Sequence, residues 1–399
     1  MQKKLIVVAL AAAFTLPVAA HAENGNFNFY GVADLSYDMV NTGDGTTKAN
    51  GTTATSGTSK GVVSSNVSKF GFKGTEDLGD GLSANWQVEQ QINIDDAAKN
   101  TFASRNTFVN LKSEKLGTVL FGTNDTPYKF ASRKLDPFGD NIGDNRALLG
   151  NNINELVPAT KATVTVPSTP GTYTITDAKA AVKNLGFELR PNNIFMYTTP
   201  TFSGFNAAVA MVNLKEANTL SSDKKDDLTS FAVMYDVAPF YGSVAHEVHK
   251  LESVAAGDEE SASRAGFGYK PEDQPFELGA IYEKTNDNFG SAQANAFGHK
   301  TAYVSGKYLM GNNAIKLGYT KTGNFAGLAG TTTDSGATQV SVGYDHGLSK
   351  RTKLYALYTK ITNGKGANYG FSQSSGAAST TSGFGTSPSV VSLGVKHTF

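Results

Sequence analysis

The chain has 399 residues, of which 18% are charged and 42 are glycine, and its 35 basic residues balance its 35 acidic ones. Soluble globular domains usually contain about 25% charged residues and about 7% glycine, so this composition argues against a helical cytosolic enzyme. The balanced charge provides no basic field that would attract nucleic acid. The chain has no cysteine, which excludes disulfide scaffolds, thiolate metal sites and cysteine nucleophiles.

The first 22 residues have the pattern of a secretory signal peptide. Lys3 and Lys4 form a positive start, residues 5–16 are almost wholly apolar, and Ala20-His21-Ala22 has the small-x-small form of a cleavage site. An uncleaved anchor helix is the alternative, but the apolar stretch is shorter than the ~20 residues needed to cross a bilayer. We therefore expect a signal peptide over residues 1–22, export from the cytoplasm, and one domain over residues 23–399.

The rest of the chain shows repeated alternation of apolar and polar residues. At the C-terminus, Val391, Leu393 and Val395 fall on one face, opposite Ser392, Gly394 and Lys396. Similar patterns begin at Phe27, Leu82, Phe276, Ile315 and Val340. Each alternating segment is about ten residues long, which is typical of a tilted transmembrane strand, whereas strands in soluble sheets usually have about five or six.

An exported chain with this alternation is either a soluble sandwich or a closed barrel that spans a membrane. A barrel is the alternative to helices because it pairs every backbone polar group between strands. Aromatic residues near the predicted strand ends favour the barrel, since aromatic girdles lie at membrane interfaces. These residues are Phe29, Tyr37, Trp86, Tyr282, Tyr308, Tyr319, Tyr344, Tyr358 and Phe399.

Short and long connections alternate between the predicted strands, as in outer-membrane barrels. Seven short and eight long connections predict sixteen antiparallel strands, with short periplasmic turns, long extracellular loops and both termini at the periplasmic end. The loops over 41–65 and 363–387 are rich in Gly, Ser and Thr, so we expect them to be mobile. The third long connection, 126–185, is unusually large, and its segments 164–166 and 172–176 predict an added hairpin.

Several segments together resemble the general porins of Gram-negative bacteria, in particular the trimeric porins of betaproteobacteria such as Neisseria and Burkholderia. The resemblance covers essentially the whole chain and rests on Phe29–Asp34, Phe70–Leu82, Arg190–Phe205, Leu348–Tyr355 and the terminal Phe399. It implies a homotrimeric barrel in contact with outer-membrane lipid and lipopolysaccharide, with the third loop folded into the pore. The implied function is a water-filled channel for passive diffusion of ions and small hydrophilic solutes.

Charged residues in and near the third loop are the candidates for a pore constriction. Alternation directs Lys69 and Lys73 to the lumen, whereas Arg105 shares its alternation set with Val109 and Leu111, which leaves its direction open. Opposed charges in a narrow passage sort ions and orient polar solutes. We predict that the constriction and lumen include Lys69, Lys73, Arg105, Lys129, Arg133, Asp136, Asp140, Asp144 and Arg190.

Two further features concern this resemblance. Family members often have Gly-Arg where this chain has Gly122-Thr123, so one wall charge is expected to be missing. The ring of Phe399 is expected at the periplasmic girdle, and in the family the terminal residue belongs to an assembly signal.

Catalytic and metal-binding motifs are not found in the sequence. His246 and His249 are three residues apart, which places them on opposite faces of a strand, and the helical H-E-x-x-H spacing is absent. Phosphate-loop and nucleophile-elbow motifs are also absent. We therefore expect no cofactor, no metal and no enzymatic activity. Two alternatives remain: a barrel enzyme with a Ser/His group at its rim, and a barrel whose long loops act mainly as an adhesin or host-interaction surface.

Overall fold

The computed structural model describes residues 26–44, 57–96, 100, 102–150, 166–168, 171–173, 186–213, 226–251, 259–286, 298–326, 334–365, 367–374, 376–377 and 385–399. The predicted signal peptide, and parts of the loops that bear on an adhesin role, lie outside these ranges. Within the described ranges, no helix is long and apolar enough to cross a membrane.

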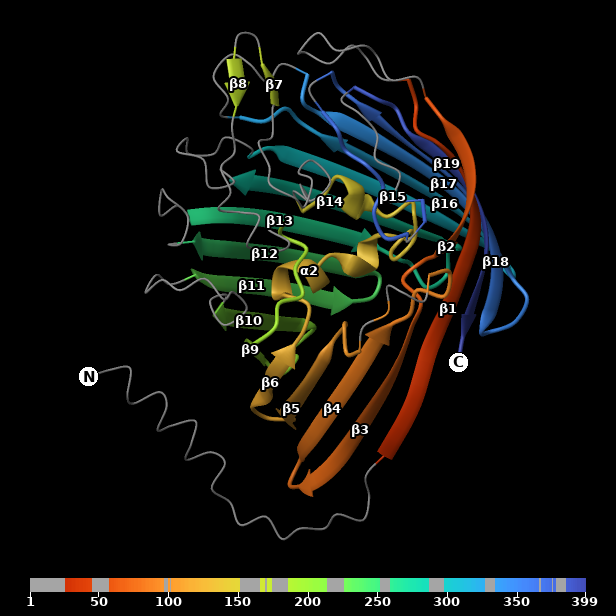
Figure 1. The fold of residues 1–399 in the computed structure, drawn as a ribbon. Coiled ribbons are helices and arrows are strands. Elements are labelled where there is room, and N and C mark those ends of the chain that lie inside the picture. The colour runs from red at the N-terminus through yellow and green to blue at the C-terminus, as the bar shows by residue number, and fades with distance from the viewer. Residues whose placement is uncertain are drawn as a thin grey trace.

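The chain forms one closed antiparallel barrel of sixteen strand positions, as predicted from the alternating connections (Figure 1). β2 (Ser59–Ser65) and β3 (Lys69–Gly79) pair in succession with β1 (Asn26–Asn41), so they occupy one position, interrupted at residues 66–68. The other wall strands are β4 (Leu82–Gln91), β5 (Thr107–Ser113), β6 (Gly117–Thr123), β9 (Ile194–Thr198), β10 (Phe205–Asn213), β11 (Asp226–Val237), β12 (Phe240–Leu251), β13 (Glu259–Tyr269), β14 (Phe276–Asn286), β15 (Lys300–Met310), β16 (Asn313–Thr322), β17 (Ala337–Gly347), β18 (Thr352–Asn363) and β19 (Ser389–Thr398).

The barrel closes where the first strand meets the last. β1 and β19 pair from Val32↔Thr398 to Asn41↔Ser389. Phe399 extends this seam, because its backbone N–H donates to the Gly31 carbonyl at 3.0 Å and its carbonyl accepts from the Gly31 N–H at 2.9 Å. The Phe399 ring occupies the space that a side chain at position 31 would fill, and it lies 5.6 Å from the Phe29 ring between centroids.

The alternation of the strands separates an apolar outer surface from a largely polar inner one. On β1, Phe29 and Tyr37 are 53% and 52% exposed, whereas Asp34 and Asp38 on the other face are almost fully buried. The same inversion appears on β16, where Leu317 is exposed and Lys316 is buried. Large apolar side chains on the outside of a closed barrel are stable against hydrocarbon or another apolar surface, which fits the membrane-spanning arrangement that the sequence predicts.

The first part of the long segment between β6 and β9, residues 124–150, folds into the barrel, as the resemblance implies. It contains a short helix α2 (Pro127–Phe130) and two 3₁₀ turns, η2 (Arg133–Leu135) and η3 (Asn145–Ala147). These elements follow the inner wall, α2 along β10–β12, η2 along β13 and β14, and η3 at β16. We name residues 124–150 the inner loop. Figure 1 shows α2 enclosed by the strands.

The predicted hairpin in this segment is present but differs in its bounds. β7 (Val166–Ser168) pairs with β8 (Gly171–Tyr173), so the first strand begins two residues later than expected and includes Pro167. The expected turn over residues 167–171 is therefore shorter. A two-stranded hairpin has only edge strands, where proline is tolerated because its missing N–H need not face a neighbouring strand.

The inner wall is not uniformly polar, in contrast to the expected wet interior. Leu120, Ile194, Met196, Val212 and Leu228 on the inner faces of β6 and β9–β11 form a buried apolar cluster, and Phe130 and Leu189 pack against it. The inner loop thus covers an apolar part of the wall. Alternation alone gives no indication of this, because it identifies the two faces but not which part of the lumen a loop will cover.

The expectation of a mobile last loop is wrong for its described residues. Tyr369 and Phe371 are 3% and 2% exposed and pack in one cluster with Ile142 and Leu148 of the inner loop. The Asn363 amide donates to the Tyr369 carbonyl at 2.9 Å and accepts from the Tyr369 N–H at 2.9 Å. The Gly- and Ser-rich composition obscured these aromatic anchors, which supply enough buried apolar surface to order the backbone.

Candidate functional site

A buried ion pair on the wall attaches the inner loop to the barrel. Glu283 on β14 accepts from both Nε and NH2 of Arg264 on β13, at 3.0 and 2.5 Å. It also accepts from Tyr128 Oη of α2 at 2.6 Å and from the Gly150 N–H at 2.8 Å. Arg264 in turn donates to Ser132 Oγ at 2.9 Å. Two wall side chains therefore hold the first third and the end of the inner loop.

Glycines on the inner wall form sockets for two side chains of the inner loop. A Cβ at Gly266 or Gly268 would lie 2.7 or 2.8 Å from the Leu135 side chain, and one at Gly279 would lie 2.6 Å from the Leu135 carbonyl oxygen. Phe138 fills a second socket, where a Cβ at Gly343 would lie 2.9 Å from its ring. The missing side chains let the inner loop approach the wall backbone closely.

Cations and carboxylates alternate around the passage between the inner loop and β3–β5. Glu89 is shared by Arg105 at 2.6 Å and Lys69 at 3.8 Å. Asp125 is shared by Lys129 and Arg190, each at 2.9 Å.

Asp140 repeats this arrangement within the inner loop, where it is shared by Arg133 and Arg146, each at 2.9 Å. Asp144 supports the same two arginines, at 3.3 Å from Arg133 and 2.6 Å from Arg146. Glu89 and Asp125 each have two cationic partners, whereas Asp140 and Asp144 share two arginines between them. The passage therefore keeps an excess of positive charge. We name these residues the constriction cluster: Lys69, Glu89, Arg105, Asp125, Lys129, Arg133, Asp140, Asp144, Arg146 and Arg190.

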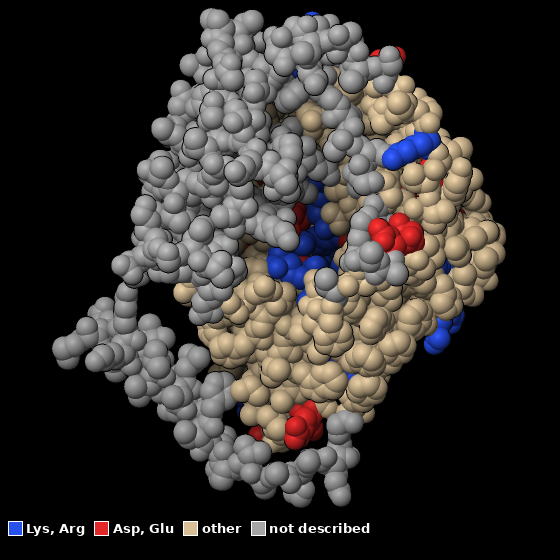
Figure 2. Space-filling view, in the orientation of Figure 1, with Lys and Arg blue, Asp and Glu red and all other residues tan. Residues whose placement is uncertain are grey.

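The constriction cluster borders a cavity of about 560 Å³ at the long-loop side of the inner loop. Four cations line it, Arg105, Lys129, Arg146 and Arg190, against the two carboxylates Asp140 and Glu188. Figure 2 shows the same imbalance, with blue side chains gathered in the hollow at the centre of this face. The cavity walls also carry the amides of Gln91, Asn192 and Gln373.

Asp125 and Asp140 of the inner loop are ionised over a wide pH range. Burial alone would raise the pKa of Asp125, but Lys129 and Arg190 outweigh burial and hold it well below its usual range. The same balance, with Arg133 and Arg146 as the cations, lowers the pKa of Asp140. Lys129 differs, because burial, aided by Arg190 and Arg146, lowers its pKa to about 8 despite the nearby Asp125. Lys129 is thus the cation of the inner loop that titrates nearest to neutral pH.

The structure places the predicted site residues in three environments. Arg105, Lys129 and Arg190 line the cavity, while Arg133 and Asp140 form its inner-loop edge. Lys69 lies beside Glu89, and Lys73 is exposed on the lumen side with its ammonium 5.3 Å from the centre of the Tyr30 ring.

The remaining two predicted residues, Asp136 and Asp144, are buried within the inner loop. Asp136 accepts from Tyr303 Oη at 2.7 Å and from the Asn145 N–H at 2.9 Å. Asp144 is fully buried and accepts from Arg146. Both maintain the shape of the loop.

Arg105 shows why alternation left its direction open. β5 begins at Thr107, so Arg105 precedes the strand and is not governed by the strand period. Its backbone N–H donates to the Glu89 carbonyl at 3.0 Å, and its guanidinium donates to the Glu89 carboxylate. At the expected missing wall charge, Thr123 Oγ1 donates to the Asn192 side chain at 2.9 Å and lines the cavity. Arg190 supplies a guanidinium in the same cavity.

The sequence did not predict four residues of the site: Glu89, Asp125, Glu188 and Gln373. Glu89 shares the lumen-facing alternation of β4 with Gln87 and Gln91, which was the available signal. Asp125 directly precedes the predicted loop boundary. Gln373 has a φ of +67° and reaches the cavity only because the last loop folds inward, which its composition did not suggest.

The two strand histidines lie on opposite faces of β12, as predicted. His249 is fully buried on the inner side and contacts Glu247 at 3.0 Å, and its ring stacks on Phe187. His246 is exposed on the outer side, and its Nδ1 lies 2.9 Å from Ser263 Oγ. In the described part of the chain, no cluster of three or more His, Asp or Glu side chains is arranged to hold a metal ion.

A closed barrel with an apolar outer surface, a charged lumen and a loop folded against the inner wall defines a transmembrane diffusion channel. Residues 7–366 match the family model described as Gram-negative porin. Outer membrane porin protein 32 of Delftia acidovorans is 25% identical over 100% of both chains. The structure of an anion-selective porin from Comamonas acidovorans covers 94% of this chain and 100% of its own, at 22% identity and a TM-score of 0.71. A trimer form of OmpT from Vibrio cholerae covers 94% and 100%, at 12% identity and a TM-score of 0.60.

This chain belongs to the Gram-negative porin family. It is an outer-membrane porin of the betaproteobacterial type, and its barrel forms a channel for passive diffusion of solutes. The short turns therefore lie at the periplasmic end and the long loops at the extracellular end.

Proposed function

We propose that the channel favours small anions over cations and that the constriction cluster sets this preference. The observation that supports the proposal is the lining of the extracellular cavity, where four cations face two carboxylates. The structurally similar porin from Comamonas acidovorans is itself described as anion-selective. Ions and small hydrophilic solutes pass by diffusion, and their charge decides the relative rate.

The physical basis is the electrostatic potential of a narrow, partly dehydrated passage. Charges at a constriction act more strongly than the same charges in bulk water, because the low-dielectric walls concentrate the field. The carboxylates hold the arginine and lysine head groups in place. The excess cations then lower the energy of an anion in the passage and raise that of a cation.

Reversal potentials across a planar bilayer in a KCl gradient test this proposal. The wild-type channel should give a potential of the sign for chloride preference. Arg105→Gln and Arg190→Gln should each shift it toward potassium, because each removes one cavity-lining cation. Lys112→Gln is the matched control, since Lys112 faces the lumen near the periplasmic end of β5, far along the strand from Arg105. A wild-type preference for potassium would contradict the proposal.

We further propose that the barrel assembles as a homotrimer through the outer surface of its first strands. Phe27, Phe29 and Phe72 form a chain of ring contacts at 5.3–5.7 Å between centroids, which Trp86 and Phe399 extend. An aromatic patch of this size favours contact with another subunit as well as with lipid. Heat-modifiable migration on a gel tests the assembly, and loss of the trimer in Phe27→Ser together with Phe72→Ser is expected.

The outer surface is proposed to contact lipid and lipopolysaccharide, and the protein is proposed to have no enzymatic activity. Two pairs of a hydroxyl and an imidazole nitrogen lie 2.9 Å apart, Ser263 with His246 and Thr352 with His397. Among the described residues, the His246 ring makes one hydrogen bond, to Ser263. No third group in this part of the chain therefore orients the imidazole as in hydrolase triads. Measured esterase or phospholipase activity that disappears in Ser263→Ala would contradict this part of the proposal.

A further inference from the structure

A second row of charges crosses the inner wall on the periplasmic side of the inner loop. It follows neighbouring strands from β14 to β1, in the order Glu277, Lys307, Lys316, Asp345, Lys353, Lys396 and Asp34. All of these side chains lie on the lumen face of their strands, as the burial alternation shows. We name this row the lysine belt. It shares no residue with the constriction cluster.

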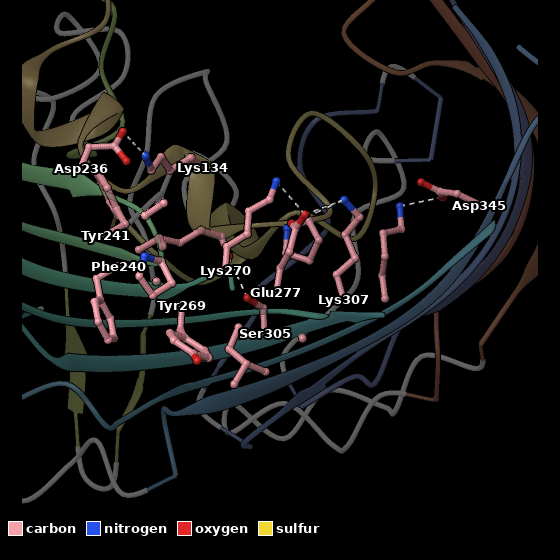
Figure 3. A pocket seen from close by; sticks show the side chains of 18 of the residues that line it. Lys134, Asp236, Phe240, Tyr241, Tyr269, Lys270, Glu277, Ser305, Lys307 and Asp345 are labelled. Carbon is pink, nitrogen blue, oxygen red and sulfur yellow. Dashed lines mark hydrogen bonds and ion pairs between the residues drawn. The ribbon is translucent and has the colours of Figure 1, made fainter. Parts of the chain in front are cut away.

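Each carboxylate of the belt is held by lysines. Lys307 Nζ lies 3.4 Å from Glu277, which Lys270 also contacts at 3.0 Å. Asp345 is shared by Lys316 at 2.8 Å and Lys353 at 2.6 Å. Figure 3 shows Lys270 and Lys307 on either side of Glu277, and Asp345 further along the wall. Glu277 and Asp345 thus each have two lysine partners, an excess of one positive charge at each carboxylate, whereas Asp34 pairs with Lys396 at 3.4 Å.

At two places in the belt, lysines are direct neighbours across a pair of strands. Lys307 on β15 is opposite Lys316 on β16, and Lys353 on β18 is opposite Lys396 on β19. Directly opposed residues have Cβ atoms about 4.5–5.5 Å apart, and like charges in this position destabilise the sheet. Their own carboxylates lie on the far side of each lysine, toward the next strand. The space between each pair therefore suits an anion.

Both lysine pairs border the periplasmic vestibule, with three of the four lysines partly exposed; Lys316 is 7% exposed, and its ammonium lies 5.1 Å from the centre of the Phe138 ring. Lys307 and Lys316 border a hollow of about 470 Å³ beneath the inner loop, and Lys353 and Lys396 border a second hollow of about 660 Å³. Lys307 and Lys353 border both hollows, so the two pairs face one continuous space. The side chains of Lys307, Lys353 and Lys396 are 28%, 37% and 29% exposed, which leaves their ammonium groups accessible to solute.

We propose that the two lysine pairs of the belt are binding stations for small multivalent oxyanions, such as phosphate or dicarboxylates. An oxyanion with two or more oxygens accepts hydrogen bonds from both ammonium groups of a pair and removes their mutual repulsion. A monovalent halide gains less, because it has one charge and no separate acceptor atoms. This inference rests on the proposed anion preference and adds a class of anion to it. An anion reaches the belt either through the constriction cluster or from the periplasm.

The test measures chloride current through single trimers while inorganic phosphate is added at pH 7.5 to the periplasmic side. Phosphate should reduce the current in a saturable manner. The double variant Lys307→Gln with Lys353→Gln removes one cation from each pair, and we expect it to raise the half-blocking phosphate concentration at least tenfold. Lys112→Gln, which removes a lumen lysine at the periplasmic end of the opposite wall, should leave that concentration unchanged.

Three controls make the outcome decisive. Heat-modifiable trimer shows that the double variant folds, and its block by phosphate is expressed relative to its own unit conductance in phosphate-free KCl. If its half-blocking concentration equals that of the wild type, or if the block depends on Arg105 instead, the inference is wrong. Reversal potentials in KCl alone report the constriction cluster separately. A wild-type channel that prefers potassium, but whose phosphate block still depends on Lys307 and Lys353, would overturn the proposed selectivity and leave the belt in place.

Discussion

Replacing Glu283 by Gln should release the inner loop from the wall without disrupting the barrel. In the wild type, Glu283 Oε2 accepts from Arg264 Nε, Arg264 NH2 and Tyr128 Oη, while Oε1 accepts from the Gly150 N–H. Glutamine has nearly the same shape but only one acceptor oxygen. Its NH2 group would face either the donors of Arg264 and Tyr128 or the donor of Gly150. The Arg264 charge would lose Glu283 and keep Glu188, which lies 2.6 Å from its NH1.

The expected magnitude follows from the burial of the pair. Glu283 is 0% exposed and Arg264 is 4% exposed, so solvent cannot replace the lost contacts. A hydrogen bond to a charged group contributes about 1.5–3 kcal/mol, and glutamine loses at least one of the two that Tyr128 and Gly150 donate to the carboxylate. At about 1.4 kcal/mol per factor of ten, the equilibrium between docked and released loop shifts by about one to two orders of magnitude. The ion pair with Arg264 joins two wall strands, so its loss weakens the wall equally in the docked and the released state.

Single-channel recording measures the result. We expect Glu283→Gln to show a larger mean conductance and greater open-channel noise, because the inner loop samples positions away from the wall. Thr285→Val is the matched control: Thr285 is buried on the same face of β14, two residues away, and contacts His299 instead of the inner loop. If Glu283→Gln forms normal trimers with wild-type conductance and noise, the ion pair does not hold the loop, and the reasoning fails.

Three other changes have distinct expected outcomes. Since the pKa of Lys129 is lowered to about 8, its charge is present at pH 7 and lost as the pH rises; reversal potentials should therefore show less chloride preference at pH 9 than at pH 7, whereas Lys129→Arg should keep it. An equal decline in both proteins would exclude Lys129 as the cause. Deleting Phe399 removes the closing hydrogen bonds to Gly31 and should lower the yield of folded trimer on gels, and an unchanged yield would contradict its predicted assembly role. Lys69→Gln should shift selectivity toward potassium more than Lys73→Gln, because Lys69 contacts Glu89 of the constriction cluster; equal shifts would argue against that difference.

The wall of the barrel is largely predictable from the sequence because it depends on a local period. Alternation identified the lipid face through residues such as Phe29 and Leu317, and the alternating connections gave the strand number. Alternation left the direction of Arg105 open, because this residue lies outside a strand, just before β5. The expectation for the last loop failed, because a Gly- and Ser-rich composition does not reveal where two aromatic side chains will pack.

The interior is less predictable because it depends on contacts between distant segments. The charges of the inner loop were identified as candidates, but not which of them line the passage. Asp136 and Asp144 are turned inward by backbone hydrogen bonds that exist only in the folded loop. Glu283 and Arg264 looked like ordinary lumen residues, since their partner Tyr128 is 155 residues from Glu283 in the chain. The lysine belt emerges only from the strand register.

The seam between β1 and β19 has a consequence for biogenesis. Until the last residues arrive, the sheet is an open ribbon with two unpaired borders, and each border can join a foreign strand. The cylinder forms only when segments more than 350 residues apart find each other, such as Val32 and Thr398, and such distant pairing is slow. Delivery of the whole polypeptide to its membrane must therefore precede closure, and a factor that shields the free borders during transit would decide the yield.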